Sequence, residues 1–264
     1  MRRCSSFAFL VIAVLSGGFS TAAPAQDLRV LPAECTLTGS AARQRLVVQR
    51  VQGDTFTSQV ATGVTFTSDH PEIAQVSGTG EVQPVADGVA TITAKVGDQT
   101  STTKVTVAGS AQQHTWDFRN DVLPVLAKAG CNTGACHGAL AGKGGFRLSL
   151  NGYNPVADHF NIVKQDRGRR IELGAIGRSL FLAKPTGAMA HKGGLRFETD
   201  SPEYRVLSEW IAQGAAPPQD NDPVVDRLEI LPGRSRLAKD EQVQMIVRAH
   251  FTDGHTGDVT RWVK

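Results

Sequence analysis

The residues with the strongest chemical implication are Cys131, Cys136 and His137, which form a Cys-x-x-x-x-Cys-His motif. In the usual attachment signal, Cys-x-x-Cys-His, two thiols add across the vinyl groups of haem and the next histidine ligates the iron. The spacer here is longer, so its backbone must bulge out of the turn, and Gly134 is suited to the positive φ of such a bulge. The motif predicts one covalently bound haem c, with His137 as its proximal ligand.

The same three residues are open to two other interpretations. Cys131 and Cys136 would form a small disulfide loop if haem were never loaded. They could instead bind zinc together with His137 and another histidine. Zinc sites commonly combine two nearby cysteines with a distant second pair, and the chain has no second pair. Haem is therefore the favoured interpretation.

A second iron ligand is expected from the loop at residues 184–194, which holds both Met189 and His191. Its glycines allow the backbone to approach a flat cofactor closely. Either side chain can ligate haem iron, and a methionine gives a higher reduction potential than a histidine. His159, on a predicted short helix, is expected to be an ordinary surface residue, and the other four histidines are assigned no role.

The N-terminus has the pattern of a secretory signal peptide. Arg2 and Arg3 precede an apolar run at residues 7–15, and small residues follow as far as Ala25. We therefore predict a signal peptide over residues 1–25 and an exported protein, in the periplasm or at the cell surface. The apolar run is far shorter than the roughly 20 residues that span a bilayer. No transmembrane segment is expected.

Cysteine usage agrees with export and with haem. Cys4 falls within the predicted signal peptide, which leaves Cys35, Cys131 and Cys136. An odd number of cysteines in an oxidising compartment argues against a closed disulfide framework. Cys35 lies in a predicted strand, and we expect it to be a buried, inert thiol.

Length and composition indicate a globular chain of roughly two domains. The chain has 264 residues, of which 41% are hydrophobic and 20% charged, and its net charge is +3. Arg2 and Arg3 supply two of those charges, so nothing suggests nucleic-acid binding. The sequence contains no nucleophile elbow, phosphate loop or paired-carboxylate motif. This favours an electron carrier over an enzyme.

Residues 27–108 predict an antiparallel β-sandwich. Short runs rich in Val, Thr and Ile alternate with turn residues, and residues 90–96 alternate cleanly between apolar and polar. The stretch from Val64 through Pro71 and Val76 to Ile92 resembles the bacterial Ig-like group 2 domain. That resemblance implies a sandwich that acts as an extracellular spacer or an adhesion module.

The end of the chain repeats the beginning of this sandwich. Leu228-Glu229-Ile230-Leu231-Pro232 parallels Leu28-Arg29-Val30-Leu31-Pro32. An Ig-like sandwich needs about seven strands, and residues 226–264 have room for about three. We therefore expect an incomplete second Ig-like domain there, part of a protein that continues or was cut.

Residues 114–218 predict a small helical domain. Apolar residues at helical spacing lead into Cys131, with Pro124 marking a kink or a helix start. Ser201 and Pro202 begin a second helix that Gly214 ends. The expected overall fold is multidomain and mainly β plus α, with a cytochrome c-like helical domain between the two Ig-like segments.

The helical segment also resembles a known family. Residues 130–138, 142–150 and 210–215, with the Cys-His motif among them, look like the planctomycete-type cytochrome c module, which occurs beside group 2 Ig-like domains. That family has Lys-Pro-Thr-Gly and His-x-Gly-Gly at the 184–194 loop, which favours His191 over Met189 as the sixth ligand. The resemblance implies a redox partner protein and leaves its identity open.

The expected function is one-electron transfer by an exported c-type cytochrome. One alternative is a haem peroxidase or gas sensor, which needs an open sixth position. Another is an adhesive or structural cell-surface protein whose Cys-His motif is only a disulfide loop. A basic run could pair with haem propionates, dock an acidic partner or simply be solvated, and its members are Lys164, Arg167, Arg169 and Arg170.

Overall fold

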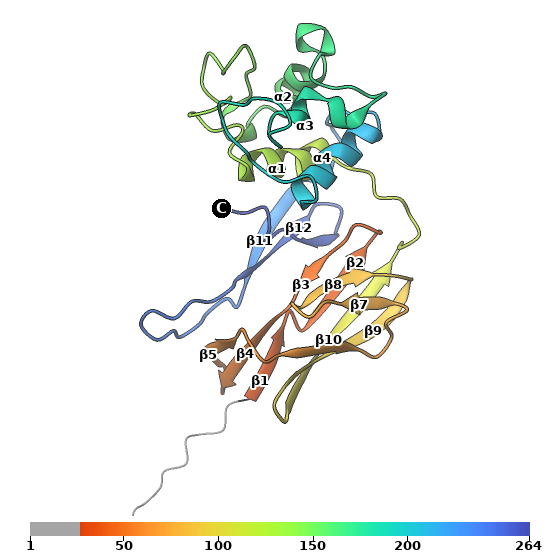
Figure 1. Ribbon diagram of the computed structural model, residues 1–264. Helices are drawn as coiled ribbons and strands as arrows, with labels where there is room; N and C mark the ends of the chain where they lie inside the picture. The colour runs from red at the N-terminus through yellow and green to blue at the C-terminus, as the bar shows by residue number, and fades with distance from the viewer. Residues whose placement is uncertain (1–26) are drawn as a thin grey trace, which may run out of the picture.

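The computed structural model describes residues 27–264, so the predicted signal peptide lies outside the described residues. The chain forms a β-sandwich, then a helical region, then a three-stranded sheet that lies between the other two (Figure 1). Within the described residues, no helix is long and apolar enough to cross a membrane.

The sandwich contains ten strands arranged in three sheets, ordered β1-β4-β5, β2-β10-β9-β6 and β3-β8-β7. Its pairings are antiparallel except for β10 with β2, which is parallel, so the predicted purely antiparallel sandwich was wrong at that pair. The strands are β1 (Asp27–Leu31), β2 (Glu34–Thr38), β3 (Gln44–Arg45), β4 (Val47–Gln52), β5 (Thr55–Val60), β6 (Thr65–Ser68), β7 (Ala74–Val76), β8 (Glu81–Pro84), β9 (Gly88–Val96) and β10 (Gln99–Ala108).

Period-two alternation places the apolar residues of the sandwich inside. Ala90, Ile92 and Ala94 of β9 are each at most 1% exposed, whereas Val89 is 46% exposed. Cys35 is a buried free thiol in β2, as predicted. Burial raises its pKa to about 12, so very little thiolate forms at neutral pH.

The helical region begins with a π-helical turn, η1 (Phe118–Val122), which continues into α1 (Leu123–Lys128). Pro124 lies in the first turn of α1, where its missing N–H costs nothing, so the predicted helix start is found there. The other elements are η2 (Leu150–Gly152), α2 (Pro155–Val163), η3 (Gln165–Gly168), η4 (Ile176–Arg178), α3 (Leu180–Ala183) and α4 (Pro202–Ala212).

Helix α4 supplies the centre of the helical core. The Ser201 side chain accepts a hydrogen bond from the Tyr204 N–H, which caps the helix as predicted. Trp210 is 0% exposed and packs against Phe118 and Phe181. This core fixes α1, and therefore the start of the Cys-His motif.

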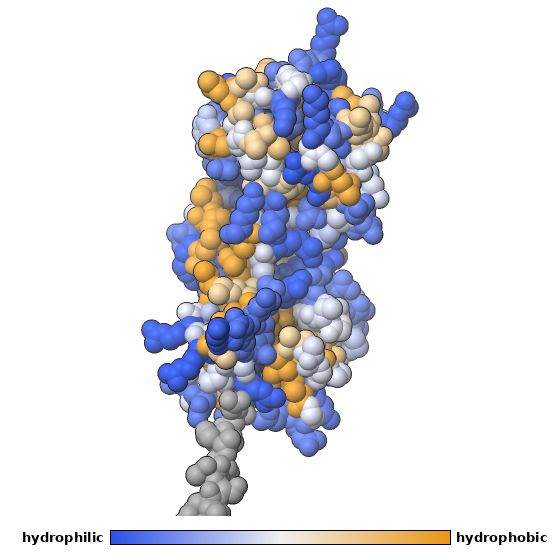
Figure 2. All heavy atoms as spheres, turned by 60° about the vertical axis from the view of Figure 1, so that its left-hand side comes forward, coloured by the Kyte–Doolittle hydropathy of each residue, from blue (hydrophilic) through white to orange (hydrophobic). Residues whose placement is uncertain are grey.

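The third part is an antiparallel sheet of β11 (Val225–Leu231), β12 (Ile246–Phe251) and β13 (Thr256–Asp258). It pairs β11 with β12 much as the sandwich pairs β1 with β4, in line with the sequence repeat. Ile230 is nevertheless 50% exposed, whereas its counterpart Val30 is 1% exposed. Figure 2 shows apolar surface gathered at mid-height, where this sheet lies.

The third sheet also contacts both neighbours. Asp258 Oδ2 accepts hydrogen bonds from the Arg45 backbone N at 2.7 Å and from Gln44 Nε2 at 3.1 Å. Lys128 Nζ, at the end of α1, donates to the Val263 carbonyl at 2.6 Å. The sheet therefore joins the sandwich to the helical region.

Candidate functional site

The Cys-His motif begins where α1 ends. Cys131 N donates to the Leu126 carbonyl at 2.8 Å, and Gly130 has a φ of +77°. The His137 N–H then donates to the Cys131 carbonyl at 2.9 Å. The backbone thus folds back on itself, and the longer spacer still brings both thiols and the imidazole to one place.

The glycine that this turn requires is Gly138, whereas the sequence pointed to Gly134. Gly134 does not adopt a positive φ. A Cβ on Gly138 would lie 2.1 Å from the Asn132 carbonyl oxygen, which no side chain tolerates. The turn is therefore made possible by Gly138, which lets two backbone segments approach closely just after the motif. It does not need a residue with positive φ in the middle of the spacer.

His137 is held in the tautomer that a metal ligand needs. Its Nδ1 lies 3.0 Å from the Phe146 carbonyl oxygen, and because a carbonyl only accepts, Nδ1 carries the proton. Nε2 therefore keeps its lone pair free. Burial lowers the pKa of His137, which further favours the neutral ring.

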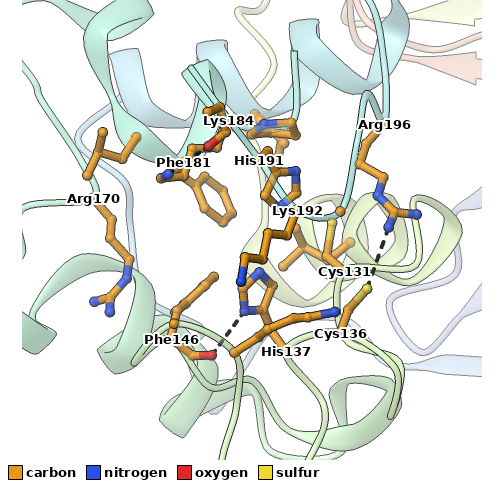
Figure 3. Close-up of a pocket in the computed structure, with 18 of the residues that line it drawn as sticks. Cys131, Cys136, His137, Phe146, Arg170, Phe181, Lys184, His191, Lys192 and Arg196 are labelled. Atoms are coloured by element: carbon orange, nitrogen blue, oxygen red, sulfur yellow. Dashed lines mark hydrogen bonds between the residues drawn. The ribbon is translucent and has the colours of Figure 1, made fainter. Parts of the chain in front are cut away.

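His191 is prepared in the same way on the opposite side of a cavity (Figure 3). Its Nδ1 lies 3.0 Å from the Gly194 carbonyl oxygen, so its Nε2 is also free. The two imidazole centroids are 6.3 Å apart and their planes differ by 7°. Two side chains that line one cavity therefore each have an Nε2 available to ligate a metal.

Met189, the other candidate for the sixth ligand, is not part of the site. Its side chain is 46% exposed, its backbone N–H donates to the Ala183 carbonyl, and it does not line the cavity. The structure thus brings His191, and not Met189, to His137.

The cavity between the histidines has a volume of about 630 Å³, within the usual range for cofactor sites. Cys131 and Cys136 line it as free thiols. Burial raises the Cys131 pKa to about 11. Much of the wall is apolar, and its largest members are Leu126, Phe146, Leu180, Phe181, Phe197 and Leu207.

The charged residues that line the cavity are all cations. They are Lys143, Arg169, Arg170, Lys184, Lys192 and Arg196, and no aspartate or glutamate of the described chain lines it. Of the basic run noted in the sequence, only Arg169 and Arg170 reach this wall. Figure 3 shows Arg170 across the cavity from the two cysteines.

Arg170 is a rigid part of the wall, being only 5% exposed. It donates to the Asn161 carbonyl and to Asp166 Oδ2, and its guanidinium lies 4.6 Å from the centroid of the Phe146 ring. The guanidinium thereby packs on the ring of Phe146, the residue whose carbonyl contacts His137. The contact of Arg170 with Phe146 could not be foreseen from the sequence, because 24 residues separate the two along the chain.

His159 was wrongly expected at the surface. It is 8% exposed, and its Nε2 donates to the Ala215 carbonyl at 2.8 Å. Its ring packs edge-on against Phe118 and Trp210, and burial lowers its pKa. His159 is therefore a neutral core residue.

A metal bound by protein ligands alone finds no support in residues 27–264. In that range, no three His, Cys, Asp or Glu side chains gather around a common point. A haem iron is different, because the porphyrin already supplies four nitrogens and two protein ligands suffice. The pair of opposed histidines fits haem better than zinc.

A family model described as a bacterial Ig-like domain matches residues 62–109. The match lies almost wholly within the sandwich, where it confirms the Ig-like part of the expected resemblance. The cytochrome c-like character of residues 114–218 stays a prediction. A comparison with curated proteins finds no match.

Several solved structures are similar to between a third and a half of this chain. The S-layer protein SbsC is 23% identical over 36% of this chain and 14% of its own, with a TM-score of 0.28. Its domains 4 and 5 are 27% identical over 33% of this chain and 54% of their own, with a TM-score of 0.25. Intimin in its Tir90 complex is 15% identical over 44% and 64%, with a TM-score of 0.21. Scores this low support no functional argument.

Proposed function

We propose that residues 114–218 bind one haem covalently and transfer single electrons. The observation that carries this proposal is the convergence of Cys131, Cys136, His137 and His191 on one cavity. These four come from two chain segments that pack on either side of it. A bound haem would supply the one-electron couple of its iron.

The chain's own residues have distinct parts in this function. Cys131 and Cys136 would form the thioethers, and His137 and His191 would ligate the iron through their free Nε2 atoms. The apolar wall excludes water and so influences the reduction potential. The cations of the wall would balance the two carboxylates that haem carries.

Two available histidines also separate electron transfer from the rival haem functions. A peroxidase or gas sensor needs a sixth position that is open to a small molecule. Both His137 and His191 line the cavity with Nε2 free of any partner among the described residues, which favours ligation by both rings. We therefore favour an electron carrier over an enzyme, with an acceptor or donor protein as its partner.

The test is a pyridine haemochrome spectrum together with intact mass, on protein exported from a host that attaches haem. We expect a c-type spectrum and one added haem, both lost in Cys131→Ala/Cys136→Ala. His191→Ala should convert the ferric spectrum from low to high spin, and Met189→Ala should leave it unchanged. Exported protein that carries no haem, with a mass two hydrogens below that of the reduced chain, would instead indicate a Cys131–Cys136 disulfide and refute the proposal.

A second candidate function belongs to the sandwich, and the family match at residues 62–109 favours it. An Ig-like sandwich in an exported protein can serve as a spacer or an adhesive module at the cell surface. Fractionation of cells that produce the wild type and Cys131→Ala/Cys136→Ala tests this. Both should be found in the same envelope or periplasmic fraction, and cytoplasmic retention of the wild type would refute export.

A further inference from the structure

Arg196 connects the two chain segments that build the site (Figure 3). Its Nη2 donates to Cys136 Sγ at 3.5 Å, and its Nη1 donates to the Ala129 carbonyl at 3.4 Å. Its backbone N donates to the Pro185 carbonyl at 2.8 Å, which anchors it in the loop that carries His191. One guanidinium thus reaches from that loop to both ends of the attachment turn.

The contact between Arg196 and His191 runs through Gly193. A Cβ on Gly193 would lie 2.7 Å from His191 Cε1 and 3.1 Å from both His191 Nε2 and Arg196 Nη2. Both side chains therefore pack closely on the same glycine. A side chain at position 193 would collide with the His191 ring and crowd the guanidinium, so the glycine allows Arg196 and His191 to lie this close together.

Arg196 is also a cation without a carboxylate partner in the described part of the chain. An arginine usually places its planar fork on a carboxylate or phosphate. Here the fork is divided between a sulfur and a carbonyl oxygen, one at each end of the turn from Ala129 to Cys136.

The geometry points to Arg196 as a positioning residue for haem attachment, an inference that rests on the proposed function. It directs the Cys136 thiol toward the cavity and ties the His191 loop to the attachment turn. In the attachment step the S–H bond breaks, sulfur bonds to the vinyl carbon next to the ring, and the proton ends on the terminal vinyl carbon. Nothing is oxidised or reduced, and Arg196 itself forms no bond.

The test compares Arg196→Gln, Arg196→Lys and the wild type, all exported with haem attachment. Intact mass does not distinguish one thioether from two, but a remaining vinyl group moves the haemochrome band to longer wavelength. Cys136→Ala provides the reference for single attachment. Arg178→Gln is the matched control, since Arg178 is exposed and lies outside the cavity wall.

We expect Arg196→Gln to lower the ratio of doubly to singly attached haem roughly tenfold, the effect of losing one hydrogen bond to a charged group. Arg196→Lys should be intermediate, because an ammonium keeps the charge but cannot reach both acceptors. A wild-type ratio in Arg196→Gln, or full recovery in Arg196→Lys, would overturn the inference. If Arg196→Gln cannot be isolated as folded protein, the ratio measured in Arg196→Lys tests the inference instead. Haem-free wild type would instead contradict the proposed function.

A second measurement tests whether Arg196 also affects the binding of His191 to the iron. Added imidazole should displace His191 more readily in Arg196→Gln than in the wild type. In a Cys136→Ala background the same substitution should have a smaller effect, because the connection has already lost one end. Equal effects in the two backgrounds would show that Arg196 does not couple Cys136 to His191.

Discussion

Ile92 in the sandwich and Phe181 in the helical region are both buried large apolar residues, yet their surroundings differ. Ile92 packs among other side chains of the sandwich, such as Leu37 and Val105. Phe181 packs on Trp210 on one side and borders the cavity of about 630 Å³ on the other. The main core of the sandwich is filled by its own side chains, whereas the helical region surrounds a space that a flat cofactor would fill.

The largest expected effect concerns this cavity. Haem attachment should stabilise the helical region by several kcal/mol and raise its Tm by more than about 10 °C, because only the folded form buries the attached porphyrin in the cavity and holds both histidines on its iron. Calorimetry of the loaded wild type and haem-free Cys131→Ala/Cys136→Ala measures this. The transition of the sandwich should not move, and an equal shift of both transitions would contradict the comparison.

A substitution in the core of the sandwich should destabilise the sandwich and leave the haem site unaffected. Ile92→Ala should lower the free energy of unfolding of the sandwich by about 2–5 kcal/mol, since it leaves a cavity in a closed core. The haem spectrum should stay unchanged. Val89→Ala on the same strand is the matched control, because Val89 is 46% exposed. A urea titration followed by fluorescence and haem absorbance would expose any coupling between the two regions.

A smaller effect is expected at Asp117, where burial, with Asp222 and Asp121 nearby, raises the pKa from 3.8 to about 6. The folded state favours the protonated carboxyl, so this contribution to stability is present below about pH 4 and is lost as the pH rises through 6. Asp117 accepts from the Asn120 N–H, and an asparagine can still do so.

Asp117→Asn should therefore be roughly 1–2 kcal/mol more stable than the wild type at pH 7 and equally stable at pH 4. Urea unfolding at the two pH values measures the difference. Asp220→Asn, at an exposed position, should show no such dependence. A variant that is destabilised at pH 7 would mean that the charge of Asp117 is favourable.

The smallest effect is expected in the third sheet. Ile230→Ala should change the free energy of unfolding by less than about 0.5 kcal/mol, because its side chain is half exposed. Val30→Ala, at the corresponding place in β1, should cost roughly 1–3 kcal/mol. Similar costs at both positions would show that the open face of β11 and β12 is covered in solution.

Periodicity in the sequence was enough to predict the sandwich, because Ala90, Ile92 and Ala94 alternate with polar residues and face one core. The Cys-His motif indicated residues that line one cavity, because its members lie close together in sequence, and the haem expected there stays a prediction. The parallel pairing of β2 with β10 was missed, because an alternating pattern does not tell which edge a strand joins. Arg196 and the buried position of His159 were missed because tertiary contacts alone define them.

The choice between His191 and Met189 shows the same limit. Both residues occur in one glycine-containing loop, and the residues alone left the two open. The Gly194 carbonyl holds the His191 imidazole 6.3 Å from the His137 ring, centroid to centroid, and the Ala183 carbonyl holds the Met189 backbone where the residue is 46% exposed. Two backbone hydrogen bonds thus favour His191, and its ligation of an iron stays a prediction.

The contact between the first and third sheets has a mechanical consequence. Leu31 and Val47 of the sandwich pack against Ile246, and Asp258 bonds to the Arg45 backbone. A pulling force applied between β1 and β13 would load this sheet-to-sheet contact first. The helical region connects the two along the chain but lies beyond the third sheet in space (Figure 1), so its cavity and its two histidines would carry no load until that contact breaks.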